Sequence, residues 1–198
     1  VFPNRNPATA RAARIRCVNN LKEIGVGFLL FANENNGQFP TASNNEAQAW
    51  VCFQEIGKKL THPKLLICPA DKERPIDPKD PPATDFTTMA TAGRNEIRFA
   101  HPKHQDGSLS YFVGLGAATN RSQMILTGDR NLTMTPLPSG NIWTLGTNAT
   151  VGWTEKIHYR GGNVGLVDGS VQQFTNHKLT DQLRVTGDDA NRVVMPGN

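Results

Sequence analysis

One stretch near the start of the chain, residues 7–36, constrains the fold most because it predicts a single long amphipathic helix. Its apolar side chains recur at steps of three and four, which places them on one face of a helix. They are Ile15, Val18, Leu21, Ile24, Phe28, Phe31 and Ala32. About 29 residues at ~1.5 Å each give a rod of roughly 43 Å, longer than most helices of globular domains. We expect the rod to project from the domain, to pack into an assembly, or to continue a segment outside the sequence.

Asn35-Asn36-Gly37 predicts the end of this helix, because Asn and Gly tolerate the left-handed conformation that closes helices. The 198 residues suffice for one domain with a substantial core. The net charge of +4 is too small to indicate nucleic acid by itself. Basic residues nevertheless gather at the start of the helix, where a basic stripe consists of Arg11, Arg14 and Arg16. Such a stripe suits phospholipid headgroups or nucleic acid, or it is a solvated helix face.

The segment after the long helix predicts a second helix over residues 46–60, introduced by the capping-box spacing of Ser43 and Glu46. Residues 64–68 form a short apolar run, interpreted as a buried strand or as an extended segment packed on the core. Residues 71–108 are rich in proline and charge, and they predict a long, partly irregular surface excursion.

From Ser108 onward the pattern is that of β-strands. We expect two strands and two hairpins, over residues 109–115, 123–128, 132–135 with 141–144, and 163–167 with 170–174. The second hairpin turns at Asp168-Gly169, a pair that favours a type I′ turn. A short closing helix is expected over 179–185, capped by Thr180 or Asn176, and the polar tail from Gly187 is expected to be peripheral.

Helices first and strands later favour an α+β fold rather than an α/β fold. We therefore expect a long N-terminal helix, residues 1–36, packed on an antiparallel sheet. The sheet would belong to a globular α+β head formed by residues 37–198.

His158 and Asp168 are the first candidates for catalytic or metal-binding side chains. Nine residues and one predicted strand separate them, so they would lie roughly 25–30 Å apart at ~3.3 Å per residue. We therefore interpret both as structural, Asp168 in the turn and His158 in a local hydrogen bond. An enzyme that uses the pair stays an alternative. No motif for a nucleophile, a phosphate loop or a zinc site occurs, and we expect no enzymatic activity.

Other polar side chains give weaker signals. His101, His104 and Asp106 have the chemistry of metal ligands, but they lie in the irregular stretch and are interpreted as solvated loop residues. We expect no cofactor other than a possible calcium ion, which would need several convergent oxygens. The candidates for such oxygens are Asp129, at the end of a predicted strand, and Asp188 and Asp189 with Asn191.

Several segments resemble bacterial type IV pilin-like proteins, in particular the pseudopilins of type II secretion. The run from Arg14 to Gly25 and the run from Phe31 to Gly37 resemble the helix just after the membrane anchor of these proteins. Three short segments extend the likeness, at residues 67–71, 110–112 and 128–131. The strongest match is His158, nine residues, then Asp168-Gly169, which is similar to the H-x9-DG motif of a prepilin-processing-associated group.

This resemblance implies a pilin-like fold and a structural role. It also implies a leader, a prepilin peptidase site before a methylated Phe, and an apolar anchor, of which residues 1–3 would be the end. The head would then face the periplasm at the bacterial inner membrane. Assembly with copies of itself, with other pseudopilin subunits and with the secretion platform would use the helix. The expected packing residues are Ile15, Val18, Leu21, Ile24 and Phe28.

The three cysteines, Cys17, Cys52 and Cys68, permit one disulfide with three possible pairings. Cys17 and Cys68 both lie in segments that carry the resemblance, which therefore favours a Cys17–Cys68 bond in an oxidising periplasm. Two other functions stay open. One is a membrane-tethered periplasmic binding or surface protein that does not polymerise. The other is nucleic-acid uptake through the basic helix, which the modest charge makes the weaker interpretation.

Overall fold

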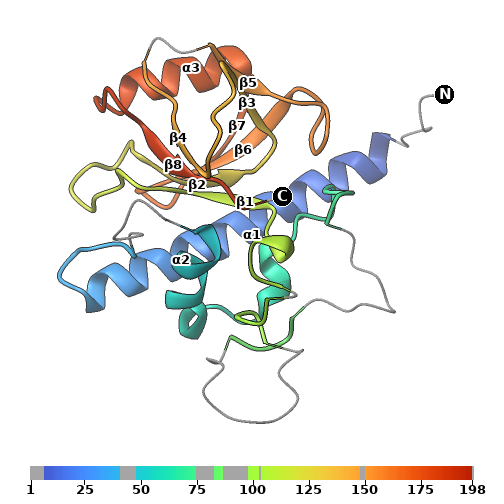
Figure 1. Ribbon diagram of the computed structural model, residues 1–198, viewed down its shortest axis with the longest axis vertical. Coiled ribbons are helices and arrows are strands. Elements are labelled where there is room, and N and C mark those ends of the chain that lie inside the picture. Colours follow the sequence, from blue (N-terminus) through green and yellow to red (C-terminus); the bar gives the residue numbers. More distant parts are fainter. Residues whose placement is uncertain are drawn as a thin grey trace.

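The computed structural model describes residues 7–40, 48–74, 83–86, 98–102, 104–147 and 150–197. A six-stranded antiparallel sheet lies between two layers (Figure 1). On one face lie the long helix α1 (Pro7–Glu34) and the short helix α2 (Ala49–Glu55). On the other face lie helix α3 (Asn176–Val185) and a separate two-stranded sheet. The predicted α+β class is therefore confirmed.

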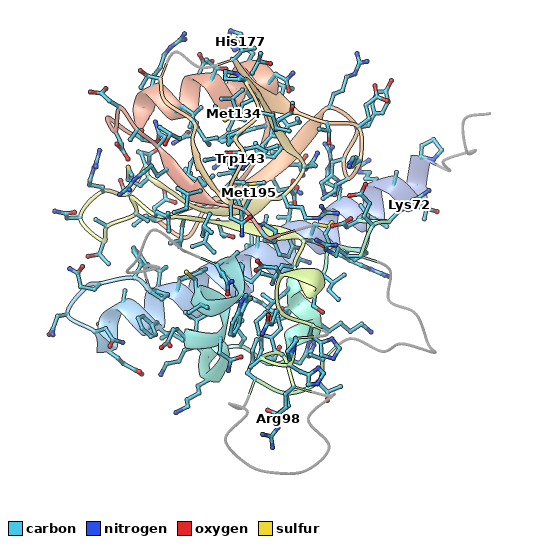
Figure 2. All side chains as sticks on the ribbon, in the orientation of Figure 1. Lys72, Arg98, Met134, Trp143, His177 and Met195 are labelled. Atoms are coloured by element: carbon cyan, nitrogen blue, oxygen red, sulfur yellow. A yellow bond between two sulfur atoms is a disulfide. The ribbon has the colours of Figure 1, made fainter. Side chains whose placement is uncertain are left out.

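The strand order of the large sheet is β4-β8-β1-β2-β6-β7. Its strands are β1 (Tyr111–Gly114), β2 (Ile125–Asp129), β4 (Ile142–Thr144), β6 (Gly161–Leu166), β7 (Val171–Thr175) and β8 (Arg192–Val194). The small sheet pairs β3 (Leu132–Thr135) with β5 (Thr150–Trp153). Alternation along β1 divides the core. Tyr111 and Val113 face the α1 side, whereas Phe112 packs on the α3 side. Figure 2 labels three side chains of the α3 side, Met134, Trp143 and Met195.

Helix α1 forms as its apolar spacing predicts. Leu21, Ile24 and Phe28 are fully buried, and the helix packs on β6, on the two segments that follow α2 (residues 57–59 and 63–66), and on β2 and β7. Ile15, which was expected on the same apolar face, is instead 50% exposed. The predicted end is also confirmed, because Gly37 has a φ of +77° and its N–H donates to the carbonyl of Ala32 at 2.8 Å. In the described ranges, no helix combines the length and the apolar character needed to cross a bilayer.

The predicted hairpin of residues 163–167 with 170–174 is confirmed as β6 and β7, but its turn type differs. Gly169 has a φ of +82°, and Asp168 is not in the left-handed region. The Gly169 N–H donates to Leu166 O at 3.0 Å, and the Leu166 N–H donates to Ser170 O at 2.9 Å. These bonds describe a type I turn closed by a glycine bulge, which needs only one residue with positive φ.

The structure corrects five further predictions, three of which concern local structure. The second helix stops at Glu55 and continues as a 3-10 turn, η1 (Gly57–Lys59), because Gly57 lies under the ring of Phe86. Its predicted capping box, residues 43–46, lies outside the described residues. In the apolar run 64–68, residues 65–68 are buried in the core, as one of the two interpretations expected, but the run begins in a second 3-10 turn, η2 (Pro63–Leu66), and forms no strand. The cap of α3 is Thr175, whose hydroxyl accepts from the Lys178 N–H at 3.4 Å.

The last two corrections concern strand pairing. The strands expected to form one hairpin, β3 and β4, belong to different sheets, where β3 pairs with β5 and β4 pairs with β8. Strand β8 lies in the tail that was expected to be peripheral, and it fills the sheet between β4 and β1. Val193 and Val194 are buried there, because a strand between two others has both faces and both edges covered.

Candidate functional site

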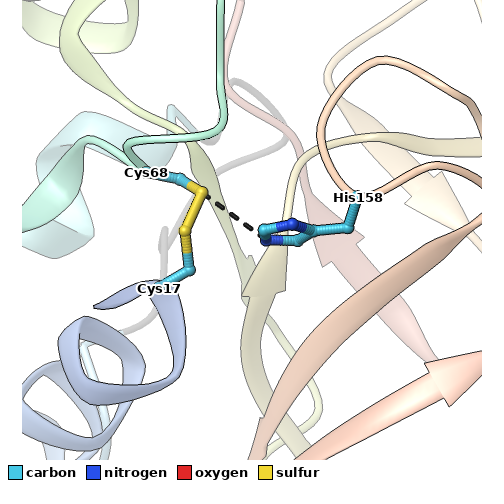
Figure 3. A group of neighbouring side chains, drawn as sticks. All are labelled: Cys17, Cys68 and His158. Atoms are coloured by element: carbon cyan, nitrogen blue, oxygen red, sulfur yellow. Dashed lines mark hydrogen bonds between the residues drawn. A yellow bond between two sulfur atoms is a disulfide. The ribbon is translucent and has the colours of Figure 1, made fainter. Parts of the chain in front are cut away.

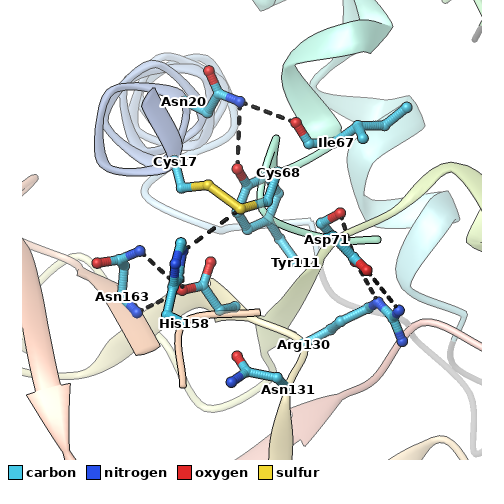
Figure 4. The surroundings of a disulfide bond; sticks show 12 residues. Cys17, Asn20, Ile67, Cys68, Asp71, Tyr111, Arg130, Asn131, His158 and Asn163 are labelled. Atoms are coloured by element: carbon cyan, nitrogen blue, oxygen red, sulfur yellow. Dashed lines mark hydrogen bonds and ion pairs between the residues drawn. A yellow bond between two sulfur atoms is a disulfide. The ribbon is translucent and has the colours of Figure 1, made fainter. Parts of the chain in front are cut away.

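A buried polar cluster lies where α1 meets the head, and we call it the α1 junction (Figure 4). Its members come from α1, from the segment after η2, from β1, from the end of β2, from the loop before β6 and from β6 itself. They are Cys17, Asn20, Cys68, Asp71, Tyr111, Asp129, Arg130, Asn131, His158 and Asn163. Most of the separate segments that carry the pilin-like resemblance therefore meet at one place, and the exceptions are the run from Phe31 to Gly37 and Asp168-Gly169.

A disulfide between Cys17 and Cys68 ties α1 to the segment after η2, with both residues fully buried. This is the pairing that the resemblance favours. The imidazole of His158 faces the bond, with its Nε2 3.6 Å from Cys68 Sγ (Figure 3). Cys52 is buried and lies outside the disulfide.

The loop that presents His158 is held at both ends by Asn131. The Asn131 amide donates to the carbonyl of Thr154 at 3.2 Å and to that of Gly161 at 3.1 Å. Tyr159 and Arg160 directly follow the histidine with φ values of 49° and 57°. Two consecutive left-handed residues are unfavourable for side chains other than glycine, so the clamp by Asn131 fixes a backbone path that points His158 inward.

Asp129 ends β2 with its carboxylate fully buried. Its Oδ2 accepts from the backbone N–H of Asn163 at 2.7 Å and from the Asn163 amide at 2.9 Å, and it lies 3.4 Å from His158 Nε2. Its Oδ1 has no hydrogen-bond partner in the part of the chain that the structure describes. A buried carboxylate with one oxygen unpaired is costly to ionise.

Burial shifts the pKa values of Asp129 and His158 in opposite directions, and each shift favours the uncharged form of the side chain. Desolvation raises the pKa of Asp129 to about 7, against the hydrogen bonds from Asn163 and the charge of Arg14. Desolvation and the charge of Arg14 lower the pKa of His158 to about 4, and Asp71 opposes this shift. Between pH 4 and 7 both side chains are therefore uncharged in the folded protein.

A second set of polar side chains, some of them exposed to solvent, also connects the segments of the α1 junction. The guanidinium of Arg130 contacts both carboxylate oxygens of Asp71, at 2.7 and 3.0 Å, and also reaches Glu73 at 2.8 Å. The Ser110 hydroxyl donates a hydrogen bond to Asp71 Oδ2, with 2.9 Å between the two oxygens. Lys156, two residues before the histidine, pairs with Glu73 at 2.8 Å. The segment that carries Cys68 is thus fastened to the segments that carry Asp129 and His158.

The basic stripe of α1 is divided in the structure. Arg11 and Arg16 are exposed, whereas Arg14 is half-buried and donates its Nη2–H to the carbonyl of His158. Asn20, further along α1, donates to Ile67 O at 3.3 Å and lies 3.4 Å from the hydroxyl of Tyr111. These contacts orient the helix relative to the head.

The structure does not bring His158 and Asp168 together. Asp168 is exposed in the hairpin turn, where its Oδ1 accepts from the Ser170 N–H at 2.8 Å. The carboxylate that faces His158 is that of Asp129. A Cys–His–Asp catalytic arrangement needs the sulfur and the carboxylate to face different ring nitrogens, whereas here both face Nε2.

The other metal-ligand candidates form no common site. Asp188 accepts from the Ala190 N–H at 3.0 Å, and Asn191 Oδ1 accepts from Thr186 at 2.9 Å. His104 is buried, with Nδ1 3.3 Å from Ser108 Oγ, so its interpretation as solvated is wrong. Asp106 accepts from the N–H groups of Trp50 and Gly197. Within the described ranges, one set of three His, Cys, Asp or Glu side chains converges, and it consists of Cys17, Cys68 and His158.

Three junction contacts were not predicted from the sequence: Arg14 with His158 O, Asp71 with Arg130, and Asn163 with Asp129. The run Gly128-Asp129-Arg130-Asn131, in which three polar residues follow a predicted strand, contains one partner of each of the last two contacts but none of the first. Comparison of the chain with protein-family models, with curated proteins and with solved structures gives no match.

Proposed function

We propose that this protein is a structural, pseudopilin-like subunit that assembles through α1 at a bacterial inner membrane. The observation that carries the proposal is the division of α1. One face is locked onto the head, and the start of the helix and its opposite face are open to solvent. A pilin-like subunit needs both properties, because the helix must contact neighbours while the head stays attached to it.

The outward face of α1 carries apolar side chains that the head does not cover. Ile15, Val26 and Leu30 are 50%, 53% and 46% exposed. At 3.6 residues per turn, these three residues lie on one side of the helix, opposite Leu21 and Phe28. Of the five expected packing residues, Leu21, Ile24 and Phe28 are used within the chain, so Ile15 and the half-buried Val18 stay available for neighbours.

The attachment of α1 to the head extends along the helix. Arg14 bonds the histidine loop, Cys17 forms the disulfide, Asn20 contacts the segment after η2, and Glu34 pairs with Lys59 of η1. Because one of these contacts is the Cys17–Cys68 disulfide, α1 stays attached to the head when mechanical force acts on the helix. An oxidising compartment such as the periplasm is where such a bond persists.

Cysteine crosslinking in cells tests the proposal. In the full-length chain with Cys52→Ser, Ile15→Cys or Val26→Cys places a thiol on the outward face of α1. The matched control is Leu137→Cys, at a head residue that is 67% exposed. We expect an oxidant to give covalent dimers with the two α1 variants and none with the control.

A monomer in both α1 variants would contradict assembly through this face, and it would favour a tethered protein that does not polymerise. Equal dimer yields from α1 and from Leu137 would contradict it as well, because they would report random collision in the membrane.

A further inference from the structure

The disulfide and the histidine beside it place three side chains of the metal-ligating kinds together in the α1 junction. We propose that, when the Cys17–Cys68 bond is reduced, both thiolates and the His158 imidazole bind one thiophilic divalent cation of the zinc class. The Asp129 carboxylate lies beside these three ligands, with its Oδ2 3.4 Å from His158 Nε2. This inference does not depend on the proposed function, because it concerns the reduced chain and not its assembly.

Three ligand atoms of the proposed site already lie close together. The two sulfurs and His158 Nε2 all lie within 4.8 Å of one another. Nε2 is 3.6 Å from Cys68 Sγ and 3.4 Å from Asp129 Oδ2. In a tetrahedral zinc site with Zn–S of about 2.3 Å and Zn–N of about 2.0 Å, ligand atoms lie about 3.3 to 3.8 Å apart. Reduction of the disulfide frees the two sulfurs to move apart toward this spacing.

The charges of the site also match a divalent cation. Two thiolates and one neutral imidazole cancel the charge of the metal, which suits a fully buried position. The Asp129 carboxylate adds one negative charge, and Arg14, bound to the carbonyl of His158, lies close enough to offset it. The unpartnered Oδ1 of Asp129 gains from a nearby cation, because nothing else in the described structure satisfies that oxygen.

The chemistry balances with a phosphine as reductant. The disulfide takes up two electrons and two protons to give two thiols, and the phosphine becomes a phosphine oxide with oxygen from water. Each thiol then loses one proton as it binds the metal, so two protons are released for each ion. Because both cysteines are fully buried, we expect capture of the ion to accompany closure of α1 onto the head.

Cobalt(II) titration of the reduced protein tests this site, with Zn²⁺ as competitor. The full chain with Cys52→Ser is reduced with the phosphine in chelated buffer. We expect one equivalent of Co²⁺ to bind with the visible absorption of tetrahedral cobalt thiolate, and Zn²⁺ to abolish that absorption. The oxidised protein should give no such spectrum. His158→Gln should weaken binding by at least about tenfold, whereas Asp168→Asn, in the exposed turn, should leave binding unchanged.

Several results would overturn the proposal. One is a reduced protein without the cobalt–thiolate absorption, and another is equal affinity in the wild type and His158→Gln. If the reduced chain unfolds, Zn²⁺ must restore its far-ultraviolet circular dichroism, and failure to do so also overturns the site.

Discussion

The paired pKa shifts of His158 and Asp129 make a specific prediction about stability and pH. In the unfolded chain, with ordinary pKa values of 6.5 and 3.8, both groups are charged near pH 5. In the folded protein, with pKa values of about 4 and 7, both are neutral. The folded and unfolded states hold the same number of protons on this pair. The pair therefore does not make the free energy of unfolding change with pH between pH 4 and 6.5.

Replacing either residue of the pair should reveal the pH dependence of stability that the remaining residue contributes. In His158→Gln, folded Asp129 keeps a proton that the unfolded state has lost, so stability falls as pH rises. The slope is about 1.4 kcal/mol per pH unit and the total about 4 kcal/mol. In Asp129→Asn, unfolded His158 holds a proton that the folded state lacks, so stability rises with pH between 4 and 6.5, by about 3 kcal/mol in total.

Urea unfolding at several pH values between 4 and 7.5, with the disulfide intact, measures both slopes as differences from the wild type. The exposed residue Asp189 provides a matched control, because Asp189→Asn also removes one carboxylate, but from the surface. Its profile should follow that of the wild type. The reasoning is refuted if the two junction variants differ from the wild type by a constant at all pH values, or if their slopes have the same sign.

Three further substitutions test other contacts by urea unfolding at pH 7. Replacing Cys17 and Cys68 together by Ser should cost about 4 kcal/mol, because the bond closes a loop spanning 51 positions; a loss under about 1 kcal/mol would contradict this. Asp71→Asn should cost about 3 kcal/mol by leaving Arg130 partly unpaired in a buried position, and an unchanged midpoint would count against it. Asp168→Ala should cost about 1 kcal/mol, the scale of a lost hydrogen bond in the turn, and an unaltered free energy of unfolding would argue against that role.

Elements defined by local patterns were predicted well. The period of Leu21, Ile24 and Phe28 alone specifies α1 and its buried face, and Asn36 and Gly37 specify its end. The hairpin of β6 and β7 follows from Asp168-Gly169 between two apolar runs. In each of these, the residues that determine the structure lie within a few positions of one another.

Pairing between distant segments was not predictable in the same way. Pro136 to Gly140 has the composition of a hairpin turn, yet it connects two different sheets, in which β3 pairs with β5 and β4 pairs with β8. Strand β8 has three residues inside a polar tail, and only its position between β4 and β1 makes it a strand. Local composition carries no information about such a position.

The α1 junction was only partly predictable for the same reason. The resemblance marked several of its segments, and it favoured the observed cysteine pairing. Arg14 and His158, however, are 144 positions apart, and Asp129 and Asn163 are 34 apart. The sequence offered Asp168 as a partner of His158 only in the alternative of an enzyme, and the carboxylate that faces His158 in the structure is that of Asp129.

The oligomeric state of the full-length protein, extracted from bacterial membranes, tests the proposed assembly through α1 most directly. Single-molecule counting after gentle extraction should find oligomers for the wild type. The same measurement should find monomers for Ile15→Asp with Val26→Asp, two changes on the exposed face of α1 that leave the buried face intact. Monomers for the wild type, or unchanged oligomers for the double variant with a folded head, would contradict assembly through this helix.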